Sequence, residues 1–193
     1  MRVTDDRYTR DWLRLDLAVR MIQHEARTCT IRAWTGLSDD RIRKLYRTYV
    51  RLAPHSGVRR HRGKPPTQIG FFLRSRETRG QAALLAGLCV RLGLVGEARP
   101  GAVPAKAPPT MQWSGLFCSA YEAYVALRPA HRLSFEHGWS LLEALERRAE
   151  LALAECPACG ALMLADLLRV QARVCTFCEL EPPPRRTRAD LAH

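Results

Sequence analysis

The sequence predicts a mostly α-helical fold in which a small four-cysteine module follows a larger helical domain. Through most of residues 11–149, apolar residues recur at three- and four-residue steps, the spacing of a helix face. Two CxxC pairs then lie close together, at 156–159 and 175–178. We therefore expect a helical domain over 1–153, a cysteine module over 154–181 and a disordered basic tail with three prolines over 182–193.

The first predicted helix covers 11–28 and has a wide apolar face. One stripe of apolar side chains follows the helical spacing: Trp12, Leu15, Val19, Ile22 and Ala26. Leu13, Leu17 and Met21 widen this stripe. A face of this width predicts that the helix packs on two sides, with another chain on one of them.

A helix-turn-helix-like segment is expected next, at 30–47. Gly36 breaks a first short helix, and Ser38 is a suitable N-cap for a second helix with two aspartates in its first turn. Ile42 and Leu45 would pack the second helix on the first. The exposed side would then present four cations to DNA: Arg41, Arg43, Lys44 and Arg47. The alternative is a solvated helix with ordinary caps.

A basic loop, broken by proline and glycine, occupies 54–66. Its clustered cations Arg59, Arg60 and Arg62 are further candidate DNA contacts, because such clusters neutralise phosphates without regard to sequence. The formal net charge of the chain is +12. Residues 1–64 carry 16 basic and 7 acidic residues, so a net charge of +9 lies in this part. The excess favours a polyanionic partner, either nucleic acid or an anionic membrane surface.

Three more helical segments complete the predicted domain. They lie over 68–93, over 114–127 and after Ser134, and the last of them carries Trp139 on its inward face. The proline-rich stretch 96–109 has no periodicity and is expected to be a connection. Three isolated cysteines in apolar surroundings are expected to be small core residues: Cys29, Cys89 and Cys118.

The other four cysteines, Cys156 and Cys159 with Cys175 and Cys178, predict one zinc site. Fifteen residues separate the pairs, which is enough to bring one CxxC turn beside the other around a tetrahedral ion. Gly160 permits the backbone turn after the first pair, and 161–164 with 169–174 would form a hairpin, as in zinc ribbons. Four protein ligands leave no open position, so the zinc would be structural. Two redox-active or disulfide-bonded pairs are the alternative.

Several classes of protein are not expected. No apolar stretch reaches the 18 to 20 residues, roughly, that a membrane span needs, and the charged N-terminus does not resemble a signal peptide. We therefore expect a cytoplasmic protein with reduced thiols. No nucleophile elbow, P-loop or zincin helix is found, so an enzyme is not expected.

The order of these features resembles the FlhC family, the C subunit of the flagellar master transcriptional activator. The resemblance covers 11–52 and 134–185, where the Trp139 helix runs into CxxC–x15–CxxC. In the first region it rests on Leu37, Ser38, Arg41, Ile42, Lys44, Leu45 and Tyr46. The proline-rich stretch 96–109 departs from the family pattern.

This resemblance implies a subunit that binds double-stranded promoter DNA in a hetero-oligomer with FlhD. It also implies activation of flagellar operons through RNA polymerase, with one zinc ion per chain on the four cysteines named above. The DNA contacts are inferred from charge and helical position, because no short family motif defines them. Two other functions remain open: an RNA-binding or RNA-processing protein with a zinc ribbon, and a structural zinc adaptor.

Overall fold

The computed structural model describes most of the chain. The described residues are 2–53, 57–61, 63, 66, 68–95, 110–168 and 174–181. For residues 2–6 only the helical backbone is described. The predicted basic tail over 182–193, the proline-rich stretch 96–109 and Arg62 lie outside them.

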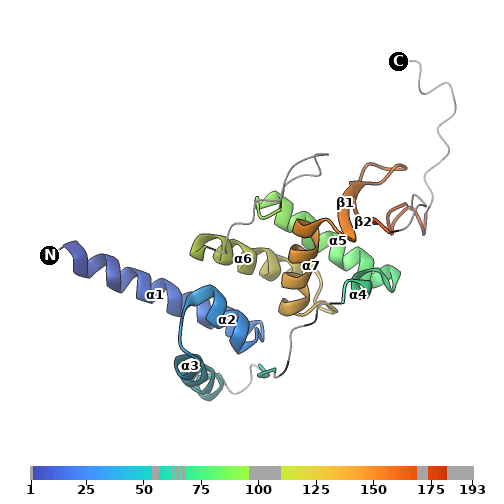
Figure 1. Cartoon of the computed structure of the whole chain (residues 1–193). Helices are drawn as coiled ribbons and strands as arrows, with labels where there is room; N and C mark the ends of the chain where they lie inside the picture. The colour runs from blue at the N-terminus through green and yellow to red at the C-terminus, as the bar shows by residue number, and fades with distance from the viewer. Residues whose placement is uncertain are drawn as a thin grey trace, which may run out of the picture.

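The described residues form a mostly helical protein with one two-stranded sheet (Figure 1). The elements are α1 (Arg2–Gln23), α2 (Thr28–Thr35), α3 (Asp39–Leu52), α4 (Gly70–Leu73), α5 (Arg76–Arg91), α6 (Met111–Leu127), α7 (Phe135–Arg147), β1 (Leu151–Glu155) and β2 (Leu162–Asp166). The predicted helical character is therefore confirmed. None of the described helices has the length and apolar content needed to span a bilayer.

Local capping explains where several helices begin and end. Gly36 adopts φ +68° and ends α2, and the Ser38 hydroxyl accepts a hydrogen bond from the Arg41 N–H at the start of α3. Ser134 and His137 form a reciprocal capping box at the start of α7. The predicted N-cap at Ser38 and the predicted helix start after Ser134 are confirmed, and both serines bond to residues one helical turn away.

The first helix contacts α2, α3 and α6 through its C-terminal half. Leu17, Met21 and Ile22 are buried there, whereas Trp12 is 64% exposed and Leu13 is 44% exposed. Trp12 and Leu13 of the predicted apolar face lie outside the core, because the N-terminal half of α1 projects beyond the neighbouring helices (Figure 1). The expected contact of this helix with another chain stays a prediction.

An aromatic cluster ties α2 to the later helices. The Trp34 ring makes edge-to-face contacts with the Trp139 ring of α7 and the Phe117 ring of α6. The ring centroids are 4.9 and 5.4 Å apart, respectively. A buried carboxylate reinforces this junction: Glu136 of α7 accepts hydrogen bonds at the start of α2. Helices α2 and α3 are thus held on the same core as α6 and α7.

The sheet differs from the predicted hairpin. Strand β2 pairs antiparallel with β1, with Leu151 opposite Asp166 and Glu155 opposite Leu162. Residues 162–166 thus pair with residues before the first CxxC, whereas 169–173 of the predicted hairpin lie outside the described residues. Leu151 and Leu153 alternate with less buried neighbours and lie in the core, which favours this partner. Strand β1 therefore begins before the predicted boundary between 153 and 154.

The isolated cysteines do not all lie in the core. Cys89 and Cys118 are buried, as predicted, and burial raises the pKa of each thiol to about 12. Cys29 is exposed, so its predicted core position is wrong. It lies in the first turn of α2, whose buried side is formed instead by Thr30, Ile31 and Trp34.

Candidate metal centre and basic surface

The four cysteine sulfurs of the two CxxC pairs converge on one point. The Sγ atoms of Cys156, Cys159, Cys175 and Cys178 all lie within 4.8 Å of one another. A tetrahedral site with arms of about 2.3 Å has edges of about 3.8 Å. The distance of 3.6 Å between the Cys159 and Cys175 sulfurs fits such an edge. The four residues could therefore bind one metal ion.

The first cysteine turn lies in the loop of the β1–β2 hairpin. The Cys156 N–H donates to the Ala161 carbonyl at 2.8 Å, and the Gly160 N–H donates back to the Cys156 carbonyl at 2.8 Å. Gly160 has φ +74°, in the left-handed region that glycine adopts most readily. The predicted role of Gly160 in this turn is confirmed.

The second turn, at 175–180, is joined to the first by a hydrogen bond to sulfur. The Cys175 N–H donates to the Cys156 Sγ at 3.2 Å. This bond lowers the pKa of Cys156 to about 6, whereas interaction with the Cys159 thiol raises the pKa of Cys178 to about 12. Four neighbouring thiols cannot all ionise without a compensating charge, and a divalent cation supplies it.

Helix α5 holds the second turn in place. The Arg79 guanidinium donates to both Glu179 carboxylate oxygens, at 2.7 and 2.5 Å, and both side chains are mostly buried. A Cβ atom added at Gly80 would lie 3.1 Å from the Thr176 hydroxyl, so the turn packs directly on the helix backbone. Sequence reasoning missed Arg79 and Glu179, because no local pattern relates residues that are 100 positions apart.

The exposed face of α3 is cationic. Lys44, Arg47 and Arg51 are spaced at i, i+3 and i+7 and share one exposed face, whereas Ile42 and Tyr46 are buried on the other side. In the part of the chain that the structure describes, these three cations have no carboxylate within ion-pair distance. Arg51 was not among the predicted contacts, although its spacing from Arg47 could have indicated it.

The remaining predicted residues of α3 differ in their surroundings. Arg41 is exposed at the side of this face, without an ion-pair partner among the described residues. Arg43 is paired with Asp40 at 2.7 Å, and Asp39 is paired with Arg32 at 3.3 Å. Both first-turn aspartates therefore have an arginine partner.

The loop at 57–61 lies beside α3 and adds to this surface. Glu25 anchors it by accepting from the Arg59 N–H at 2.8 Å, and its second oxygen lies 2.6 Å from His61 Nε2. Arg60 donates to the Thr28 hydroxyl at 3.1 Å and lies over the Tyr46 ring, 6.0 Å from its centre. A shallow hollow between loop and helix is lined by Tyr46, Arg47, Val50, Arg51 and Arg60.

The chain matches no protein-family model, and a search of curated proteins finds no match. The cysteine cluster and the basic surface of α3 and the 57–61 loop are therefore the features that bear on function.

Proposed function

We propose that this chain is a DNA-binding subunit of a transcriptional activator that contains one structural zinc ion and acts with a partner subunit. The observation that carries the proposal is the exposed face of Lys44, Arg47 and Arg51, with Arg60 across the adjoining hollow. These cations are gathered on one helix and the neighbouring loop. A polyanionic backbone can neutralise several of them together, and the release of its counterions favours binding.

In the proposed complex α3 acts as the second helix of a helix-turn-helix. The three-residue connection from Gly36 to Ser38 has a length typical of that motif, and α3 contacts both α1 and α2. The major groove of B-DNA is wide enough for one helix. Pairing of Asp39 and Asp40 with arginines reduces the repulsion of phosphates at the start of α3.

The metal in this proposal is zinc. Four thiolates in a tetrahedral set are a preferred ligand set for Zn²⁺, and four protein ligands leave no position for water or substrate. When bound, the ion supplies fixed cross-links between the two cysteine turns. Cys156 and Cys159 hold it from the hairpin, and Cys175 and Cys178 hold it from the turn on α5. The role we propose is therefore binding, without catalysis.

The projecting half of α1 supports the partner in this proposal. Tyr8 and Trp12 are each more than three-fifths exposed, at 72% and 64%, and Leu13 lies beside them. Large exposed apolar side chains that cluster on one element are typical of protein interfaces. The resemblance of the sequence to FlhC supplies the rest of the proposal. The partner is an FlhD-type subunit, the targets are flagellar promoters, RNA polymerase is a further partner and the location is the cytoplasm.

Titration of metal-loaded protein with a fluorescent mixed-sequence DNA duplex tests the basic surface. Arg47→Glu should lower the affinity by about fivefold or more near 0.15 M salt, and should reduce the slope of log K against log salt by about one. Arg147→Glu is the matched control, because Arg147 is exposed on α7, outside the basic surface. Equal losses for the two variants would refute the assignment of α3.

The regulatory role needs a second experiment, with a coexpressed FlhD-type partner. The complex should contain one zinc ion per chain and should protect a flagellar promoter in footprinting more strongly than random duplex DNA. Equal affinity for promoter and random DNA would refute a specific regulator. Preference for a structured RNA over both duplexes would support the RNA-binding alternative instead.

A further inference from the structure

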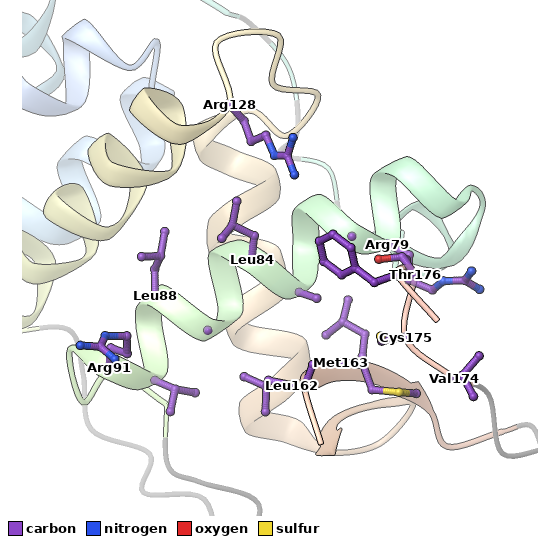
Figure 2. A pocket seen from close by; sticks show the side chains of 17 residues that line it. Arg79, Leu84, Leu88, Arg91, Arg128, Leu162, Met163, Val174, Cys175 and Thr176 are labelled. Carbon is purple, nitrogen blue, oxygen red and sulfur yellow. The ribbon is translucent and has the colours of Figure 1, made fainter. Parts of the chain in front are cut away.

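An apolar groove runs between α5 and the cysteine module. Figure 2 shows Leu84 and Leu88 of α5 on one side, and Leu162 and Met163 of β2 on the other. The second cysteine turn closes one end through Cys175, Thr176 and Phe177, and the enclosed volume is about 500 Å³. This groove is distinct from the basic surface, because no residue lines both.

The groove exists because α5 is apolar on two sides. Its inner side, which includes Ala82, Leu85 and Cys89, is buried in the core. Its other side carries Leu84 and Leu88, which are only half-buried and line the groove. A helix that is apolar all round is normally covered all round. In the part of the chain that the structure describes, the groove side is left open.

Gly87 of α5 lies in the floor of the groove. A Cβ atom added at Gly87 would meet only the Leu162 Cδ2, at 3.7 Å, so alanine would fit there without a clash. Glycine in a helix interior is less favourable than alanine by about 1 kcal/mol. The missing side chain therefore leaves α5 less stable but allows an incoming chain to approach its backbone closely.

The rim of the groove is cationic. Arg91 and Arg128 are exposed, and neither has an ion-pair partner among the described residues. They lie at separate places around the groove, with Leu84 and Leu88 between them (Figure 2). Arg79, also on the rim, is held by Glu179. An occupant that complements this rim is apolar along its centre and acidic at its edges.

We propose that this groove binds one amphipathic helix of an acidic partner protein, laid along α5. From Gly80 to Arg91 the floor spans about 16 Å, or three helical turns, which suits anchors at i, i+3 or i+4, and i+7. A second copy of this chain fits less well, because each copy has a net charge of +12. A single fatty-acid carboxylate would leave one of the two separated arginines without a counter-charge.

The test uses the full-length, metal-loaded protein and a fluorescent designed peptide, in the absence of DNA. The peptide carries leucines at i, i+4, i+7 and i+11, glutamates beside them and alanines elsewhere, and a scrambled peptide has the same composition. Fluorescence anisotropy should show about tenfold tighter binding of the periodic peptide, because its apolar residues share one face. Equal binding of the two peptides would show non-specific charge attraction and overturn the proposal.

Variants locate the binding. Arg91→Glu and Arg128→Glu should each weaken it by about threefold or more, because each reverses a rim charge. Arg147→Glu changes the same charge outside the groove and should weaken it less than twofold at physiological salt. Gly87→Leu fills the floor and should remove binding, with unchanged metal content and a Tm no lower than that of the parent protein. The proposal is overturned if all three arginine variants behave alike, or if dodecanoate saturates the groove and the peptide does not bind.

Discussion

The buried carboxylate of Glu136 is expected to stabilise the junction between α7 and α2. One carboxylate oxygen accepts from the Arg27 N–H at 2.7 Å, the other accepts from the Thr30 hydroxyl at 2.9 Å, and the residue is 3% exposed. Arg27 is the N-cap of α2 and supplies no side-chain cap. Glu136 thus provides the negative charge that a helix N-terminus favours, from another element of the fold.

Replacing this residue by glutamine keeps its size and removes its charge. A hydrogen bond to a charged group contributes about 1.5–3 kcal/mol. The amide of Glu136→Gln can accept from one donor only, and its NH2 group then meets the other donor. We therefore expect a loss of about 2–4 kcal/mol in the free energy of unfolding, and a fall in Tm of roughly 5–15 °C.

Urea unfolding followed by tryptophan fluorescence measures this loss, because Trp34 and Trp139 lie at the same junction. Glu143→Gln is the control: Glu143 lies on the same helix, is partly exposed and should change stability by less than about 0.5 kcal/mol. Thr30→Val removes one donor, so its effect should be less than additive with that of Glu136→Gln. Equal midpoints for the two glutamine variants, or full additivity, would refute this reasoning.

Metal removal, acid and loss of the Arg79 ion pair probe other parts of the molecule. Chelation should open the cysteine cluster, so that a thiol reagent modifies its four cysteines in addition to the exposed Cys29; unchanged reactivity would contradict this. Burial lowers the pKa of His24 below its ordinary 6.5, so the unfolded chain binds more protons. The stabilisation that depends on neutral His24 should be fully present above about pH 6.5 and should be lost as the pH falls below that value. The urea midpoint of His24→Gln should therefore fall less steeply with decreasing pH. Arg79→Met should speed metal release to a competing chelator more than Arg76→Met, because the Arg76–Glu179 pair is longer and more exposed.

The features that the sequence predicts correctly depend on interactions between residues close together in the chain. Ser38 and Ser134 cap their helices through hydrogen bonds to residues three positions away, so the pattern needs no knowledge of the fold. Gly160 behaves in the same way, because the left-handed conformation belongs to one residue. Convergence of the four cysteines was also predictable, because each CxxC turn brings two sulfurs together and a tetrahedral ion needs four.

The errors concern what lies next to each element. The periodicity of α1 identified an apolar face, but it could not show that the neighbouring helices end before Trp12. Leu151 and Leu153 lie on a short strand, and two alternating residues are too few to indicate a partner strand. Arg79 and Glu179 pair across 100 residues of sequence. Such contacts depend on the packing of the whole chain.

The basic surface and the groove can be occupied together, because they use separate elements. Figure 1 shows α3 well away from α5 and β2, with α7 and α2 between them. At physiological salt the Debye length is about 8 Å, so an acidic helix in the groove should hardly change the potential at Arg47. DNA affinity should therefore change less than about twofold when the periodic peptide saturates the protein. A peptide that displaces the DNA duplex would show that it binds α3, and would merge the two surfaces into one site.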